Sequence, residues 1–319
     1  MNSIKIYSPS DFPTYLPKLN SLYDDLFKDG KGFRSKLVQR IGSKIDLSDR
    51  LIELLAQTIE FIHNASLLHD DLIDHSVLRR GKPAAWTKYT PEYAVLAGDY
   101  LLARVMVNLS GHGNVRLIQR TAEAISDLLE GEWIQDSLVK DFGISLEDLN
   151  RVHDLKTGSL FKWCLSAPFI ARERYDEKLL VRLEECGGIL GLLFQRSDDL
   201  LDFDIRNNEG KAVLGDLKSG YLNSFAVWVL RGSGGQGGVS SGVFEKAIRA
   251  QSLGEFKTLV GETYFAERAE AFDQENRKLI DLYFHRLNDV REGLKDSELG
   301  VLEDLKSLPN PLYWRKRDA

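Results

Sequence analysis

Apolar residues recur every three or four positions from about residue 47 onward, as in LIELLAQTIEFIHNASLLHDDLID and LIQRTAEAISDLLEGEWIQDSL. This spacing puts them on one face of an α-helix, whereas a half-buried strand would alternate every second residue. Alternating runs of β-branched residues are few, and most of the eight prolines stand where a helix could begin or end. The pattern therefore predicts an all-α fold of long helices.

The length of 319 residues and a hydrophobic share of 43% allow a large buried core. No internal repeat and no domain boundary is visible, so we expect one domain over residues 1–319. The Gly/Ser-rich stretch 232–242 predicts a flexible loop between two helices. Residues 202–220 combine turn residues with charges of both signs and are expected to form a loop at the mouth of a site.

Charge and cysteine content limit the classes of partner and compartment. A net charge of −6 argues against general nucleic-acid binding, which needs a basic face. Only Cys164 and Cys186 are present, too few for a disulfide framework, so a reducing cytoplasm is expected. The N-terminal residues lack the apolar run of a signal peptide, and no stretch of about 18 apolar residues could span a bilayer.

Two short acidic motifs carry the strongest chemical signal. LLHDDLID and FQRSDDLLDF share the spacing DD-x-x-D, and the six aspartates are Asp70, Asp71, Asp74, Asp198, Asp199 and Asp202. On a helix, positions i and i+4 lie on one face about 6 Å apart, so each motif presents two carboxylates in one direction. Clustered carboxylates need a cation, and oxygen-only ligands suit Mg²⁺, which prefers to share phosphate oxygens.

Other interpretations of these motifs are weaker. A single DD-x-x-D on a helix is more often a solvated acidic face, but two copies amid apolar residues favour metal binding. Calcium is less suitable, because DFDIRNNEG lacks the glycine at the sixth position and the closing glutamate that an EF-hand loop needs. Basic side chains are the expected partners of a phosphorylated substrate, and the chain has enough of them to hold two separate phosphate groups. These residues are Lys31, Arg34, Arg79, Arg80, Lys156 and Lys211.

The motifs together resemble the trans-prenyl diphosphate synthases, also called polyprenyl synthetases. IHNASLLHDDLIDHSVLRRGKPA, LAGDYLLARV, KTGSLF, LGLLFQRSDDLLDF and GKAVLGDLKSG occur in the order of that family, over roughly residues 25–225. The resemblance implies a single bundle of long antiparallel helices around a deep central cavity, the isoprenoid synthase fold. It also implies a homodimer.

The resemblance further implies the reaction and its residues. An Mg²⁺-dependent prenyltransferase condenses an allylic prenyl diphosphate with isopentenyl diphosphate, and two or three Mg²⁺ ions are held by the six aspartates. Lys156 is grouped with these aspartates as catalytic. Residues matching the allylic site are Arg79, Lys156, Thr157, Gln195 and Lys211. Residues matching the isopentenyl diphosphate site are Lys31, Arg34, His63 and Arg80.

The chain departs from the family pattern at two places. In DGKGFRS, Asp29, Gly32 and Ser35 replace a glycine, an arginine and a proline of the usual first basic motif. Tyr221 stands where the family has a lysine, and LNSF follows where TLP is usual. These departures keep open the alternative of a catalytically silent subunit that regulates a partner synthase. A terpene cyclase is a second alternative, disfavoured because it needs no second diphosphate site.

Two small residues on the first acidic helix predict a long product. In short-chain members of the family, bulky aromatics occupy the fourth and fifth positions before the first motif, where this chain has Ser66 and Ala65. A helical turn rises about 5.4 Å, so a growing chain could pass these positions and extend towards Ile62 and Thr58. We expect a long-chain product beyond farnesyl, of roughly 30–40 carbons, with a synthase of farnesyl or geranylgeranyl length as the alternative. The basic C-terminal residues YWRKRDA are expected to form an exposed terminus, with closure over the mouth of the site or contact with a membrane surface that takes up product as the alternatives.

Overall fold

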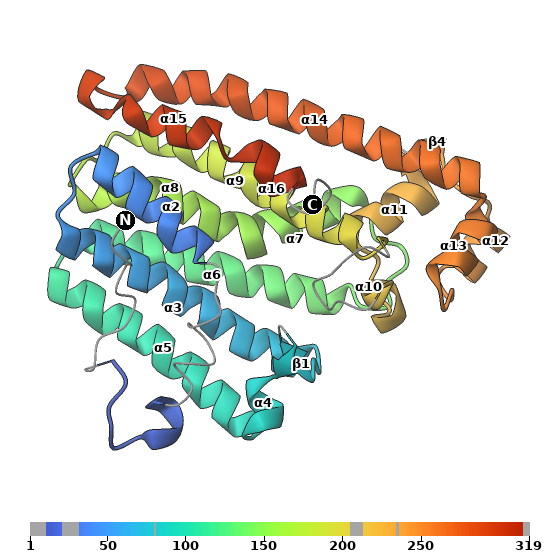
Figure 1. Ribbon diagram of the computed structural model, residues 1–319, viewed down its shortest axis with the longest axis horizontal. Coiled ribbons are helices and arrows are strands. Elements are labelled where there is room, and N and C mark those ends of the chain that lie inside the picture. Colours follow the sequence, from blue (N-terminus) through green and yellow to red (C-terminus); the bar gives the residue numbers. More distant parts are fainter. Residues whose placement is uncertain (1–10, 21–31, 80, 205–212, 234–235, 315–319) are drawn as a thin grey trace. The chain divides into compact units, whose positions relative to one another are not determined.

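The computed structural model describes residues 11–20, 32–79, 81–204, 213–233 and 236–314, and within them it confirms the all-α prediction (Figure 1). The helices up to the second acidic motif are α2 Phe33–Lys44, α3 Asp49–Ile73, α4 Ala85–Lys88, α5 Pro91–His112, α6 Val115–Ser137, α7 Leu146–His153, α8 Ser159–Ala171 and α9 Glu177–Leu201. The later helices are α10 Gly215–Ser219, α11 Ser224–Arg231, α12 Ser241–Ala247, α13 Leu253–Val260, α14 Glu262–Gly293, α15 Gly300–Lys306 and α16 Pro309–Trp314.

Short elements of other kinds complete the described part of the chain. A π-helix, η1, covers Asp154–Gly158, and a 3-10 helix, η2, covers Asp296–Glu298. Strand β1 Leu78–Arg79 pairs antiparallel with β2 Lys82–Pro83, and β3 Gly232–Ser233 pairs antiparallel with β4 Gln236–Gly237. The Gly/Ser-rich stretch thus joins α11 to α12, with a two-stranded pairing within it.

The chain divides into two compact units. The first unit contains Met1–Ser126, Leu160–Gly187 and Val290–Asp304. The second unit contains Asp127–Ser159, Gly188–Asp289 and Leu305–Ala319. The first acidic motif belongs to the first unit and the second motif to the second unit.

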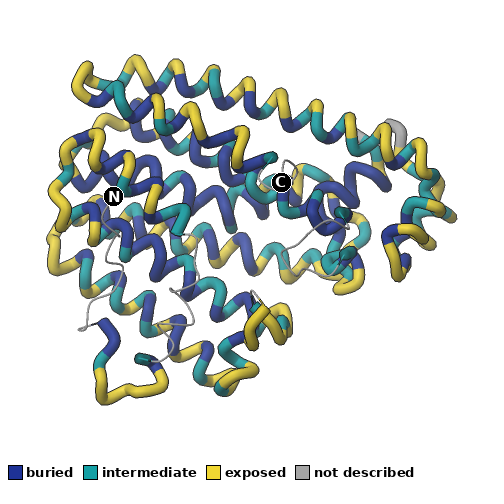
Figure 2. Tube along the Cα trace, in the orientation of Figure 1, coloured by how far each residue is buried: buried dark blue, intermediate teal, exposed yellow. Residues whose placement is uncertain are grey.

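Helices α2, α3 and α5 pack side by side in the first unit (Figure 1). The Ser48 side chain caps α3 by accepting a hydrogen bond from Leu51 N, and Thr90 caps α5 in the same way from Tyr93 N. Buried apolar residues recur at helical spacing along α3 at Ile52, Leu55, Ile59, Ile62, Ala65 and Leu68. Figure 2 shows that this buried face continues along nearly the whole helix, so packing fixes the end that carries the first acidic motif.

Aromatic rings dominate the core of the second unit beside the second acidic motif. Phe203 follows directly after that motif and packs edge-on against Phe225 of α11, with ring centroids 5.1 Å apart. Phe225 in turn packs against Phe272 of α14 at 5.3 Å. Such edge-to-face pairs add about 0.5–1.5 kcal/mol each beyond the area they bury. They anchor the end of α9 to α11.

None of the helices in the described ranges is long and apolar enough to cross a membrane. Three predicted binding residues, Lys31, Arg80 and Lys211, lie outside the described residues. The remaining predicted site residues can be placed.

Candidate active site

The first acidic motif lies at the C-terminal end of α3. Asp70 and Asp71 are buried in the last turn, whereas Asp74 is the exposed residue that caps the helix. Arg79 of β1 contacts Asp71 through a forked pair: its Nε lies 3.0 Å from Oδ1 and 3.1 Å from Oδ2, and its Nη2 also donates to Oδ1. The Arg79 guanidinium therefore neutralises the charge of the Asp71 carboxylate. Asp70 and Asp74 stand four residues apart at the end of α3, a spacing that brings two side chains to the same side of a helix.

A close contact between α3 and α5 positions this motif. The His69 imidazole occupies the space above Gly98, where a Cβ atom added to the glycine would lie only 2.2 Å from the His69 Nε2. The same nitrogen lies 3.3 Å from the Val95 carbonyl oxygen and 3.5 Å from Asp99 Oδ1. Gly98 in LAGDYLLARV is therefore required because it admits the residue that precedes Asp70.

The second acidic motif lies at the end of α9 and repeats the arrangement. Helices α3 and α9 each contain 25 residues, and each ends at the residue before the third aspartate of its motif. Asp198 is half-buried, while Asp199 and Asp202 are buried. Asp202 Oδ1 accepts a hydrogen bond from Gly215 N at 2.8 Å, and its carbonyl oxygen accepts one from Leu214 N. These bonds tie α10 to the end of α9.

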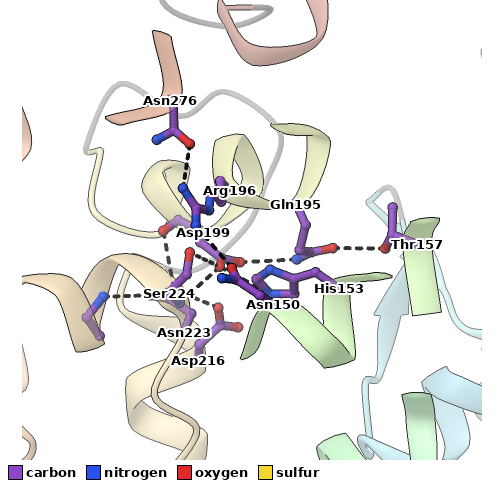
Figure 3. Close-up of polar contacts among 11 residues, drawn as sticks. Asn150, His153, Thr157, Gln195, Arg196, Asp199, Asp216, Asn223, Ser224 and Asn276 are labelled. Atoms are coloured by element: carbon purple, nitrogen blue, oxygen red, sulfur yellow. Dashed lines mark hydrogen bonds and ion pairs between the residues drawn. The ribbon is translucent and has the colours of Figure 1, made fainter. Parts of the chain in front are cut away.

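Asp199 is the centre of a buried polar network (Figure 3). Its Oδ2 accepts hydrogen bonds from Ser224 Oγ at 2.6 Å and Ser224 N at 3.0 Å, and its Oδ1 accepts one from Gln195 Nε2 at 3.1 Å. Asn223 donates to the Asp199 carbonyl oxygen and to Asp216 Oδ2. The middle aspartate of the second motif, like that of the first, is thus held by protein donors.

The chain's LNSF sequence supplies this network. Asn223 caps α11 by accepting a hydrogen bond from Ala226 N, and Ser224 is the first residue of that helix. Tyr221, which replaces an expected lysine, is half-buried and packs against the aromatic cluster around Phe225. The departure thus replaces a cation by an aromatic side chain in the core.

His153 also lies beside Asp199, with its Nε2 3.5 Å from Asp199 Oδ2 (Figure 3). Burial, followed by the nearby positive charge of Arg196, lowers the pKa of His153 to about 3, so the ring is neutral at pH 7. Burial raises the pKa of Asp199, against the lowering effect of its hydrogen bonds from Ser224 and Gln195. Arg196 is itself buried and donates to Asn276 Oδ1 and Asn150 Oδ1.

Replacing His153 by Gln is expected to reduce the loss of stability at acid pH. The unfolded chain takes up a proton at His153 below pH 6.5, whereas the folded chain does so only near pH 3. The free energy of unfolding therefore falls with decreasing pH in this window, by up to about 1.4 kcal/mol per pH unit. The raised pKa of Asp199 acts in the opposite direction, because it favours the folded state at lower pH.

Urea unfolding at pH 7 and pH 5, with EDTA present, measures this difference. The His153→Gln variant should lose less stability between the two pH values than the wild type. His112, which is exposed at the end of α5, provides the matched control variant His112→Gln, expected to behave as wild type. Equal pH dependence in all three proteins would contradict a neutral buried His153.

The π-helix η1 carries Lys156 and Thr157, and two glycines allow neighbouring helices to approach it. A Cβ atom added at Gly131 of α6 would lie 2.7 Å from Lys156 N, and one added at Gly191 of α9 would lie 2.5 Å from Gly158 Cα. Thr157 Oγ1 donates to Gln195 Oε1 at 3.2 Å, which links η1 to Asp199 through Gln195. π-Helical turns are rare and often mark functional sites.

Two residues predicted for the isopentenyl diphosphate site lie in the first unit. Arg34 is half-buried on α2, and its guanidinium lies 5.4 Å from the centre of the Phe161 ring. His63 is half-buried on α3. Ser35, in place of the family's proline, uses the N–H that proline lacks to donate to the buried Glu60 Oε1 at 3.1 Å. The departure at Ser35 is thus accommodated by a new hydrogen bond.

The donor set fits Mg²⁺ that is shared with a phosphate. Within the described ranges, no three histidine, cysteine or acidic side chains converge into a ready-made metal cage. Mg²⁺ does not need one, because it is usually bound by one or two carboxylates together with substrate phosphates and water. Asp70 with Asp74, and Asp198 with Asp202, can provide such carboxylates.

Sequence reasoning missed several residues of this site. Glu132, His153 and Ser224 are buried polar residues that contact predicted ones. Glu132 and Gly131 lie in the segment LLEGEWIQ, where a charge and a glycine interrupt an apolar face. That irregularity was a usable signal, whereas nothing in the sequence separates Ser224 from other serines.

The sequence of this chain is similar to those of known prenyl diphosphate synthases. A model of the polyprenyl synthetase family matches residues 16–252. The chain is 37% identical over 219 residues to a decaprenyl-diphosphate synthase of Dictyostelium discoideum, covering 67% of this chain and 47% of that protein. It is 36% identical over 167 residues to the octaprenyl diphosphate synthase of Escherichia coli (strain K12), covering 52% of this chain and 51% of that protein. The chain spans about half the length of the curated relatives it matches.

Solved structures agree with the family match. The crystal structure of a decaprenyl diphosphate synthase from Rhodobacter capsulatus matches with a TM-score of 0.82 and 25% identity, covering 97% of this chain and 93% of that one. A heptaprenyl diphosphate synthase from Staphylococcus aureus shares the fold, with a TM-score of 0.80, 23% identity, and coverage of 96% and 94%. The isoprenoid synthase fold expected from the motifs is confirmed, and the chain belongs to the polyprenyl synthetase family.

Proposed function

We propose that this chain is an Mg²⁺-dependent trans-prenyltransferase that condenses an allylic prenyl diphosphate with isopentenyl diphosphate to give a longer polyprenyl diphosphate. The observation that carries the proposal is the DD-x-x-D motif at the ends of both α3 and α9, in a chain of the polyprenyl synthetase family. Relatives named as octaprenyl and decaprenyl diphosphate synthases support a long-chain product.

The two acidic motifs are assigned to the metal. All six aspartates, Asp70, Asp71, Asp74, Asp198, Asp199 and Asp202, would hold Mg²⁺, with Asp71 also paired with Arg79 and Asp199 also bonded by Ser224. Bound Mg²⁺ supplies neutralisation of the negative charge that develops on a leaving diphosphate.

The basic and polar residues are assigned to the two substrates. Arg79, Lys156, Thr157, Gln195 and Lys211 would bind the allylic diphosphate, and Lys31, Arg34, His63 and Arg80 would bind isopentenyl diphosphate. The allylic carbon–oxygen bond breaks, the isopentenyl double bond forms the new carbon–carbon bond, and the released diphosphate accepts the proton that is lost. The protein provides orientation and charge stabilisation, and no protein nucleophile is required.

Incubation with labelled isopentenyl diphosphate tests the proposal. The purified chain, with MgCl₂ and geranyl, farnesyl or geranylgeranyl diphosphate, should extend at least one of these starters, and EDTA should abolish the reaction. Chromatography of the dephosphorylated products gives both activity and chain length. The same reaction without an isopentenyl substrate should give no cyclised hydrocarbon, which excludes the terpene cyclase alternative.

A catalytically silent regulatory subunit is the second candidate. The observation that favours it is Tyr221, whose ring packs into the apolar cluster where the family supplies a lysine. A chain of this kind would show no extension alone but would change the activity of a synthase added to it. The intact acidic motifs support the catalytic proposal instead.

A homodimer in the cytoplasm is a further part of the proposal. Leu129 and Trp133, spaced by one turn on α6, have apolar side chains that are 45% and 81% exposed, and these support a homodimer. Cys164 and Cys186 are both buried thiols, which supports a reducing cytoplasm. Peripheral contact with a membrane for product release, and a single domain over residues 1–319, stay predictions from the sequence.

A further inference from the structure

The ion pair between Glu132 and Lys156 has no part in the assignments above, although Lys156 is one of the proposed substrate ligands. Glu132 lies on α6, is 6% exposed, and contacts the Lys156 ammonium group directly. The adjacent Gly131 allows the backbone of α6 to reach the backbone of Lys156. The pair thus joins α6 to the π-helix η1 within the second unit.

The Glu132 carboxylate depends on Lys156 for compensation. Both of its oxygens are buried, and no hydrogen bond from a described neutral donor reaches them. A buried carboxylate that loses its paired cation bears the full penalty of desolvation. Movement of the Lys156 ammonium group towards another anion is therefore opposed by the carboxylate it would leave.

Lys156 itself is placed to be shared with a second anion. Its side chain is 21% exposed, in contrast to 8% for that of Glu132, so the ammonium group faces partly outward. The next residue, Thr157, connects through Gln195 to Asp199 of the second acidic motif. A diphosphate that meets this motif would compete with Glu132 for the same ammonium group.

We infer that Glu132 is a positioning residue that restrains Lys156 and so limits how tightly the site holds a diphosphate. The inference rests on the proposed function, because it takes Lys156 as a ligand of the allylic diphosphate and of the diphosphate product. With Glu132 present, Lys156 is kept in place on η1 and the diphosphate is released more readily. Without the carboxylate, this restraint on the Lys156 ammonium group is removed.

Calorimetric titration with inorganic pyrophosphate and MgCl₂ tests the restraint. Glu132→Gln keeps the size of the side chain and should tighten pyrophosphate binding by about two- to fivefold, the range for release of a partly exposed ion pair. In steady-state assays the same variant should lower both KM for the allylic substrate and kcat. Glu130→Gln, the same charge change two residues earlier at an exposed position of α6, should leave both unchanged.

A double-mutant cycle with Lys156→Ala separates restraint from a structural role. In the Lys156→Ala background, Glu132→Gln should have no effect on pyrophosphate affinity. Weaker binding in Glu132→Gln, or the same change in both backgrounds, would overturn the inference. Glu132→Asp serves as a second variant in case Glu132→Gln does not fold. It keeps the negative charge but withdraws it from Lys156 by one methylene, so its affinity for pyrophosphate should lie between those of the wild type and Glu132→Gln. A wild-type chain that binds no pyrophosphate with Mg²⁺ and forms no product would overturn the proposed function itself.

Discussion

Asp70→Asn and Asp198→Asn are each expected to lower the turnover number by about 10³-fold or more, because a metal ligand contributes several kcal/mol to stabilisation of the leaving diphosphate. Each substitution keeps the size and shape of the side chain, removes its charge and replaces one acceptor oxygen by an amide NH₂ group. The folded structure should persist, since the aspartates of each motif repel one another when no metal is bound. Steady-state kinetics over a range of MgCl₂ concentrations, with melting temperatures measured on the same samples, gives both quantities.

A matched control lies on the same helix as Asp70. Asp49 is exposed in the first turn of α3, far along the chain from the motif. Asp49→Asn should leave turnover at the wild-type value and lower stability by at most about 1 kcal/mol, from loss of its interaction with the helix dipole. Near-native turnover in Asp70→Asn or Asp198→Asn would exclude these carboxylates as metal ligands.

Ala65→Phe is expected to shorten the product by one or more isoprene units. Ala65 is fully buried on α3, in the part of the helix that leads up to Asp70. A phenyl ring at this position would occupy the path that we propose the growing chain takes past α3. The wild type should make a product longer than farnesyl, of roughly 30–40 carbons when the path follows the apolar length of the helix.

A graded series makes this prediction sharper. Ala65→Val, Ala65→Leu and Ala65→Phe add increasing volume, and the mean product length should fall in that order. Overpacking of a buried position costs about 1–3 kcal/mol, so unfolding must be measured for each variant. Glu53→Phe places the same ring at an exposed position of α3 and should leave product length unchanged. A constant product length across the series would mean that another wall sets the limit.

The helices were predictable because their signals are local. The apolar period along α3, its capping serine and the proline at the start of α5 are all visible within one or two turns of sequence. The sequence also predicted that both acidic motifs lie on helices, and the structure places them at the ends of α3 and α9. The strand pairings β1–β2 and β3–β4 were not predicted, because each strand has only two residues.

The different environments of the three aspartates in each motif could not be predicted. Sequence treats Asp198, Asp199 and Asp202 alike, whereas the structure holds Asp199 with donors from Ser224, which lies 25 positions further along the chain. The pairing of Lys156 with Glu132 likewise depends on the approach of α6 to η1, which Gly131 permits. Contacts of this kind depend on tertiary packing, and local patterns do not encode them.

A single-turnover reaction of the purified chain tests the central claim most directly. The chain is mixed in excess over farnesyl diphosphate, with Mg²⁺ and labelled isopentenyl diphosphate, and the products are separated after rapid quenching. Catalysis by this chain predicts that the farnesyl diphosphate is converted into longer prenyl diphosphates within one enzyme turnover per added unit, and that Asp70→Asn prevents this. Unchanged farnesyl diphosphate in a folded, Mg²⁺-supplied wild-type sample, with extension appearing only after a partner synthase is added, would contradict it.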